Sequence, residues 1–178
     1  MLIKTIFSGF GGQGVLIMGY VLAVAGMRDG KNVTFLPAYG AEVRGGTANC
    51  TVAISDEEIA SPVASSPEFV VVMNRPSLQR FENIIQSGGG LFINSSLVDT
   101  RPARGDIEIF EVPANDLAKS LGDGRLTNMV MLGAYLRKTR VAPLETTQKA
   151  IEEIFEDKGK PIITQNKKAL KAGYNHLA

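Results

Sequence analysis

A glycine-rich segment near the amino terminus carries the clearest chemical signal in the sequence. Residues 9–14 read Gly-Phe-Gly-Gly-Gln-Gly, which satisfies the spacing Gly-x-Gly-x-x-Gly between an expected strand and an expected helix. Glycines permit a tight turn with uncovered backbone N–H groups, and the start of a helix adds a partial positive charge. This glycine turn is therefore predicted to bind phosphate, pyrophosphate or carboxylate. Its candidate binding residues are Gly9, Gly11, Gly12, Gln13 and Gly14.

Neither common nucleotide-binding pattern is complete around the glycine turn. A dinucleotide site would place Asp or Glu at the end of the second strand, but Leu36-Pro37-Ala38 stands there. A Walker-type loop would continue as Gly-Lys-Ser or Gly-Lys-Thr, and this sequence does not. Ordinary NAD or ATP binding is therefore disfavoured. An alternative stays open, because such glycines can also serve only to let a helix and a strand pack closely.

A second glycine-rich loop follows the second expected strand. Residues 39–46 read Tyr-Gly-Ala-Glu-Val-Arg-Gly-Gly. Arginine offers a planar fork for carboxylate or phosphate, and tyrosine offers a stacking face and a hydroxyl. In a parallel sheet both loops lie at the carboxyl edge, where ligands bind, which favours a joint site over an isolated Glu42–Arg44 surface pair. The candidate residues of this loop are Tyr39, Glu42, Arg44 and Gly45.

The strands and helices around these loops must position them. Along the chain, short runs typical of strands alternate with runs typical of helices. Strands are predicted at 2–7, at 32–36 ending at Pro37, and at 47–55, 69–73, 91–94 and 107–112. Helices are predicted at 15–27, 75–86, 126–139 and 143–158, and one capped by Asn115 is expected to end at Leu121. The tail from Ile162 looks solvated, and it could be helical.

This order predicts an α/β fold, with a largely parallel sheet between two helical layers in an α/β/α arrangement. The crossings 36–47 and 55–69 lack a clear helix. We therefore expect a mixed sheet with at least one antiparallel strand.

Composition narrows the class of protein. The chain has 178 residues, 44% apolar and 21% charged, which predicts one globular domain over residues 1–178. The 19 Lys and Arg nearly balance the 18 Asp and Glu, so neither nucleic acid nor an anionic membrane is an expected partner. One Cys excludes an internal disulfide, a Cys-based zinc site and a self-contained iron–sulfur cluster. No targeting or membrane-spanning segment is visible, and the expected compartment is cytoplasmic.

The two loops together resemble a known family. Residues 6–14, Ile-Phe-Ser-Gly-Phe-Gly-Gly-Gln-Gly, and residues 39–50, Tyr-Gly-Ala-Glu-Val-Arg-Gly-Gly-Thr-Ala-Asn-Cys, are similar to the gamma subunit of 2-oxoacid:ferredoxin oxidoreductases. The resemblance runs along almost the whole chain, including Ser61-Pro62 and the helix from Asn128 to Leu136. Either motif alone would be weak evidence, but the pair at this separation is specific.

The resemblance implies a role as a non-cluster subunit of a heteromeric complex. Such complexes oxidatively decarboxylate a 2-oxoacid, for example pyruvate or 2-oxoglutarate, with coenzyme A, reduce ferredoxin and form acyl-CoA. Thiamine diphosphate and the iron–sulfur clusters sit largely on partner subunits or other domains, so this chain is expected to hold no cofactor alone and to be inactive when isolated. The resemblance also implies that the glycine turn meets the coenzyme A pyrophosphate, and that Arg44 meets a phosphate or a substrate carboxylate.

Two other functions stay open at this point. The chain could be a stand-alone phosphate- or nucleotide-binding module, or an interaction protein whose glycines are purely structural. Other reactive residue types have simpler explanations. His176 is expected to be solvated, Cys50 to be a buried thiol, and Met129 and Met131 to fill the core or an interface. Gly122-Asp123-Gly124 is expected to be a turn and not part of a thiamine diphosphate site.

Overall fold

The computed structural model describes residues 1–39 and 46–178, which are built around a six-stranded sheet. The strands are β1 (Leu2–Phe10), β2 (Asn32–Tyr39), β3 (Thr47–Ser55), β4 (Phe69–Val72), β5 (Gly90–Asn94) and β6 (Glu108–Val112), in the order β2-β3-β1-β4-β5-β6. Strand β3 is antiparallel to both β1 and β2, whereas β1, β4, β5 and β6 pair in parallel. The predicted mixed sheet is therefore confirmed, with β3 as its reversed strand.

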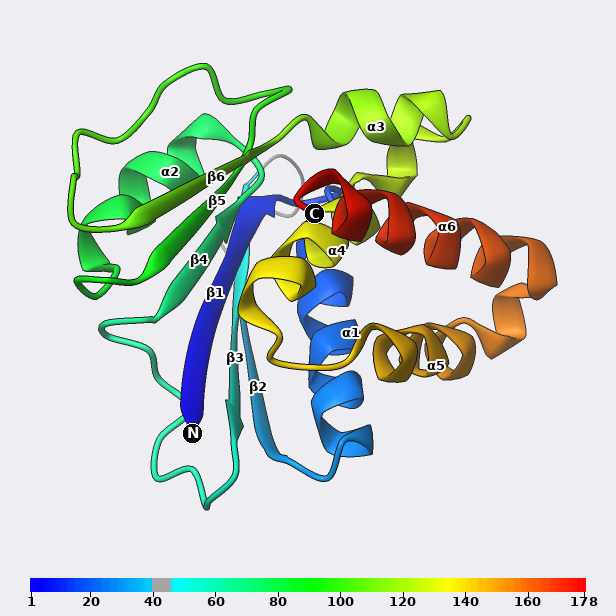
Figure 1. Ribbon diagram of the computed structural model, residues 1–178, viewed down its shortest axis with the longest axis horizontal. Helices are drawn as coiled ribbons and strands as arrows, with labels where there is room; N and C mark the ends of the chain where they lie inside the picture. Colours follow the sequence, from blue (N-terminus) through cyan, green and yellow to red (C-terminus); the bar gives the residue numbers. More distant parts are fainter. Residues whose placement is uncertain (40–45) are drawn as a thin grey trace.

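Helices cover both faces of the sheet, which confirms the α/β fold (Figure 1). One face carries α2 (Arg75–Phe81) and the 3₁₀ turn η1 (Glu82–Ile84), and the other carries α1 (Val15–Arg28) and α4 (Thr127–Thr139). The remaining helices are α3 (Ala114–Ser120), α5 (Leu144–Ile154) and α6 (Lys160–His176), with the 3₁₀ turns η2 (Gly124–Leu126) and η3 (Glu156–Lys158). Helix α5 packs on α1, and α6 packs on α4. Across the described residues, we find no helix long and apolar enough to cross a membrane.

Alternating strand residues supply the two halves of the core. Phe7 belongs to the cluster that includes α1 and α4, and its neighbour Ile6 belongs to the cluster on the α2 face. The fully buried Tyr135 anchors α4, because its ring packs edge-on against Phe7 and its hydroxyl is 2.7 Å from the Thr5 hydroxyl. This anchoring fixes where α4 begins, at the carboxyl edge of the sheet.

The second strand does not end at Pro37, which corrects the sequence prediction. Strand β2 continues through Pro37 to Tyr39, with Pro37 opposite Cys50. Proline has no N–H to donate to a ladder, but β2 is the outermost strand, so one side of it needs no partner. Strand β1 is also longer than predicted and reaches Phe10.

Several predicted helix boundaries are wrong. The helix expected at 75–86 ends at Phe81 and passes into η1, and the one expected at 143–158 becomes α5 followed by η3. Asn115 does not cap α3, because that helix begins at Ala114 after Pro113, and the Asn115 side chain instead accepts a hydrogen bond from Asn94.

The carboxyl-terminal segment is a packed helix, which corrects the expectation of a solvated tail. Ala169, Leu170 and Gly173 on one face of α6 are buried. Helix α6 approaches α4 so closely that a Cβ atom at Gly173 would overlap the backbone carbonyl of Val130. His176 at the end of the helix is exposed, as expected.

Replacing Gly173 with alanine should therefore destabilise the fold, although alanine is the better helix former. The added methyl group forces α6 away from α4, and overpacking of this kind costs about 1–3 kcal/mol. Urea denaturation followed by circular dichroism measures the loss. The matched control is Gly105→Ala, since a Cβ there meets nothing within 4 Å. Equal stability of Gly173→Ala and the parent would contradict this packing.

Cys50 should be unreactive in the folded protein. The thiol is fully buried, donates to the carbonyl of Val15 at 3.7 Å, and has its pKa raised to about 12 by burial. A thiol-specific disulfide reagent at pH 8 is expected to label Cys50 only after denaturant is added. Rapid stoichiometric labelling of the native chain would show that the contact between β3 and α1 opens readily.

Candidate functional site

The two glycine-rich loops meet at the carboxyl edge of the sheet. The N–H of Gly11 donates to the carbonyl of Gly46 at 3.0 Å, and the register places Phe10 opposite Thr47. Tyr39 ends β2 opposite Ala48, one residue farther along β3. The first loop and both ends of the second loop are therefore brought to one rim, because β1 and β2 run in the same direction on either side of β3.

Gln13 ties the glycine turn to the end of the neighbouring strand. Its Oε1 accepts hydrogen bonds from the N–H of Phe10 at 2.7 Å and from Nδ2 of Asn74 at 3.2 Å. Its Nε2 lies 3.5 Å from the carbonyl of Met73. The side chain that the sequence offered as a ligand-binding group thus also holds the turn in shape.

The glycine turn leaves no room for a side chain at its first residue. A Cβ on Gly9 would lie 2.7 Å from Oε1 of Gln13, 2.8 Å from Cγ2 of Val15 and 2.9 Å from Cβ of Met73. Gly12 and Gly14 both have positive φ values, 94° and 71°. Gly14 is the N-cap of α1 without a side-chain cap, so the first-turn amides of this helix point their partial positive charge outward.

A row of asparagine side chains lies along the same edge. Asn74 follows β4, and its Oδ1 accepts from the N–H of Ser77 at 2.9 Å, which caps α2. Asn94 ends β5 and donates to Oδ1 of Asn115 at 2.7 Å. Asn128 in α4 donates to the carbonyl of Gly14 at 3.2 Å. Sequence reasoning missed these residues, although the position of Asn74 and Asn94 at strand ends was a usable signal.

Arg125 is the cation that the described residues place beside the glycine turn. Together with Gly12, Gln13 and Asn115 it lines a cavity of about 180 Å³ at this edge. Its Nε and Nη2 donate to the carboxylate of Asp123, a contact that lowers the pKa of Asp123. The Arg125 side chain is 85% exposed, so the guanidinium remains open to a ligand. No sequence motif marked this residue.

The structure distributes the remaining sequence candidates as follows. Glu42, Arg44 and Gly45 lie outside the described residues, and Tyr39 is placed by its backbone pairing with Ala48. Gly122-Asp123-Gly124 forms the predicted turn, in which Asp123 accepts from the N–H of Arg125 at 2.9 Å. Met129 and Met131 are fully buried core residues. Over residues 1–39 and 46–178, no group of three or more His, Cys, Asp or Glu side chains is arranged to hold a metal ion.

The fold and the joined loops define an α/β protein with a glycine-rich turn between its first strand and first helix, at an edge suited to an anionic ligand. Residues 4–176 match the Pyruvate ferredoxin/flavodoxin oxidoreductase family, and the chain belongs to this family. The resemblance to gamma subunits that the two motifs predicted is therefore confirmed.

Named relatives are subunits of several 2-oxoacid oxidoreductases. The chain is 37% identical over 172 residues to "Ketoisovalerate oxidoreductase subunit VorA" of Methanothermobacter thermautotrophicus, covering 96% of this chain and 35% of that protein. It is 32% identical to "Pyruvate synthase subunit PorC" of Thermotoga maritima, covering 95% and 91%. The chain thus spans about a third of the ketoisovalerate relative and nearly all of the pyruvate synthase subunit.

Solved structures share the fold over almost the whole chain. The gamma subunit of a keto/oxoacid ferredoxin oxidoreductase from Geobacter sulfurreducens superposes with a TM-score of 0.84 at 27% identity, covering 98% of both chains. A 2-oxoglutarate:ferredoxin oxidoreductase from Magnetococcus marinus gives 0.90 at 22% identity, covering 99% of this chain and 31% of that chain. At 22% identity, the similarity to the Magnetococcus marinus protein shows a shared fold alone.

The crowding at Gly9 generates a paired prediction. Gly9→Ala should displace Gln13 or Met73 and lower the free energy of unfolding by about 1–3 kcal/mol. Gly11→Ala should change stability far less, because a Cβ there meets only the Gly46 carbonyl at 3.8 Å. Thermal denaturation of both variants measures the difference. The described conformation of the turn is wrong if Gly9→Ala is as stable as Gly11→Ala.

Proposed function

We propose that this chain is a non-cluster subunit of a complex that oxidatively decarboxylates a 2-oxoacid with coenzyme A, reduces ferredoxin and forms acyl-CoA. The observation that carries the proposal is the family match over residues 4–176, which includes both glycine-rich loops. Thiamine diphosphate and the iron–sulfur clusters belong to partner subunits in this proposal. The named relatives are subunits of pyruvate, ketoisovalerate and 2-oxoglutarate enzymes, which favours a complex over a stand-alone module.

The part of the reaction that we assign to this chain is the binding of coenzyme A phosphates. The uncapped first turn of α1 and the glycine turn offer backbone N–H groups, and Arg125 adds a positive charge on the other side of the 180 Å³ cavity. Such donors suit the pyrophosphate of coenzyme A. Arg44 and Glu42, in the loop that begins after Tyr39, are proposed to complete this site.

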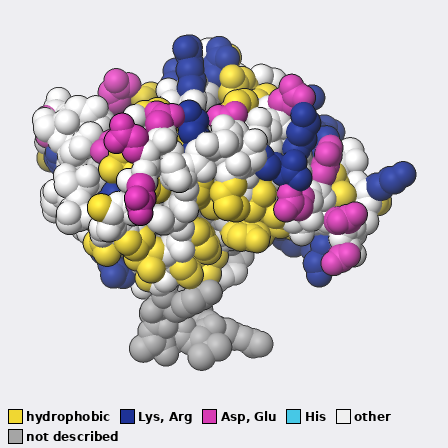
Figure 2. Space-filling model, turned by 90° about the horizontal axis from the view of Figure 1, so that it is seen from below, with side chains coloured by type: hydrophobic (Ala, Val, Ile, Leu, Met, Phe, Trp, Pro, Cys, Tyr) yellow, Lys and Arg dark blue, Asp and Glu magenta, His cyan; other side chains and the backbone are white. Residues whose placement is uncertain are grey.

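Exposed apolar side chains on the surface are suited to contacts with partner subunits. Apolar side chains gather in patches between intermingled acidic and basic ones on the face seen in Figure 2. Tyr20 and Met27 of α1 are 45% and 55% exposed, and Leu36 of the edge strand β2 is 39% exposed. Apolar side chains exposed on neighbouring elements are typical of a face that a partner covers. Their exposure supports assembly into a larger complex.

Isolation of the tagged chain from its source organism tests the proposal. We expect thiamine diphosphate and iron–sulfur subunits to co-purify, and we expect the complex to reduce a viologen dye in the presence of a 2-oxoacid and coenzyme A. The chain alone should show no turnover. Recovery of a pure monomer with no such partner would contradict the proposal.

Within the purified complex, Gly12→Val should raise the KM for coenzyme A by about tenfold or more, because a β-branched residue is strained at a φ of 94° and would cover the turn's amides. The KM for the 2-oxoacid should stay near its parental value. Steady-state kinetics with each substrate varied separately measures this split. Gly105→Ala, in open space away from the loop, is the control. An unchanged KM for coenzyme A would remove the glycine turn from the binding site.

A further inference from the structure

A second hollow lies on the other side of Arg125 from the cavity beside the glycine turn. It has a volume of about 280 Å³ and is formed between the starts of α1 and α4, the end of α5, and α6. Gly14 and Arg125 line it at one end, and its apolar walls are Ile17, Leu126, Phe155 and Ile162. Its size is below the ~300–1,000 Å³ of pockets that enclose whole drug-sized ligands, so it suits one ring system. We call it the α6 hollow.

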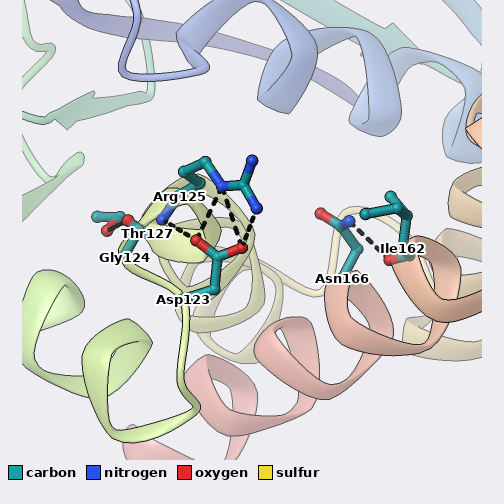
Figure 3. A network of polar contacts seen from close by, with 6 residues as sticks. All are labelled: Asp123, Gly124, Arg125, Thr127, Ile162 and Asn166. Carbon is teal, nitrogen blue, oxygen red and sulfur yellow. Dashed lines mark hydrogen bonds and ion pairs between the residues drawn. The ribbon is translucent and has the colours of Figure 1, made fainter.

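Two polar groups face each other across the α6 hollow. Asn166 is only 8% exposed, and its Nδ2 donates to the carbonyl of Ile162 at 2.8 Å. Its Oδ1 points toward Arg125 in Figure 3 and has no hydrogen-bond donor among the described residues. The Nε and Nη2 of Arg125 bind Asp123, which leaves Nη1 available. The hollow therefore offers an acceptor on one side and a donor on the other.

The polarity of these groups selects between ligand classes. A carboxylate would face Oδ1 of Asn166 and the carboxylate of Asp123, both of which repel it. A fully apolar ligand would leave Asn166 unpaired in a desolvated site, which is costly. A flat ring with an amino group on one edge and a ring nitrogen on the opposite edge satisfies both groups, and adenine has this arrangement in its 6-amino group and N3.

We propose that the α6 hollow binds the 6-aminopurine base of a nucleotide. The amino group donates to Oδ1 of Asn166, a ring nitrogen accepts from Nη1 of Arg125, and the faces of the base contact Leu126 and Phe155. Gln165, which also lines the hollow, supplies a further carboxamide at the rim. Since Arg125 borders both cavities, and Gly14 at the start of α1 lines the α6 hollow, the phosphates of such a nucleotide lie toward the first turn of α1.

This inference rests on the proposed function in one respect. If the ligand is coenzyme A, the α6 hollow holds its adenine, and the glycine turn holds its pyrophosphate. The base-binding claim itself depends only on the hollow, so nucleotides without a pantetheine arm can test it.

Calorimetric titration of the full chain with ADP and with IDP tests the proposal. IDP replaces the amino group by a carbonyl oxygen, which Oδ1 of Asn166 cannot accept from, so ADP is expected to bind about three- to tenfold more tightly. In Asn166→Leu the two nucleotides should bind equally, and binding of phosphopantetheine should be unaffected. Thr164→Ala, at an exposed position of the same helix outside the hollow, should keep the preference.

A second variant, together with the possible binding results, decides whether the α6 hollow is a base site. Ile162→Trp, which fills the hollow from its wall, should weaken ADP without weakening phosphopantetheine, and circular dichroism establishes that both variants fold. Equal binding of ADP and IDP by the parent, or a preference that survives in Asn166→Leu, overturns the base site even if coenzyme A binds and supports turnover. A preference for ADP that Asn166→Leu abolishes, in a chain that binds no coenzyme A, upholds the base site and contradicts the proposed function.

Discussion

The hydrogen bond from the N–H of Gly11 to the carbonyl of Gly46 depends on the reversed direction of β3. Because β3 is antiparallel to β1 and β2 and lies between them, it begins at the rim where both of those strands end. Backbone N–H and C=O groups at a sheet edge must form hydrogen bonds with protein groups or with water. Here the N–H of Gly11 in the first loop forms one with the carbonyl of Gly46 at the end of the second loop. The position of the start of α1 and the cavity beside Gly12 both follow from this one pairing.

Neutral amide side chains hold the rim and leave its positive potential in place. Gln13, Asn74 and Asn94 link β1, β4 and β5 through hydrogen bonds that carry no net charge. An acidic residue at any of these positions would offset the partial positive charge of the first-turn amides of α1, which are proposed to bind the ligand. Arg125, held by Asp123, then stands between two cavities as the cation shared by both. The proposed binding of phosphate on one side and base on the other follows from that position.

Periodicity and loop composition predicted most of the fold and part of the site. The strand at 47–55 and the glycine turn were predictable, because β-branched alternation and a Gly-x-Gly-x-x-Gly spacing are local signals. The packing of α6 was not, because its small buried residues matter only against α4. Arg125 was missed for the same reason, since a turn more than a hundred residues from Gly14 reaches the site only through the anchoring of α4 by Tyr135.

A structure of the assembled complex with coenzyme A bound is the most direct examination of the joined-loop site. We expect the pyrophosphate oxygens within hydrogen-bonding distance of the backbone amides at Gly12 to Val15, with Arg125 next to the ligand. Coenzyme A bound at the opposite edge of the sheet, near the starts of β4 and β5, would contradict the site. So would a ligand held entirely by partner subunits while this rim faces solvent.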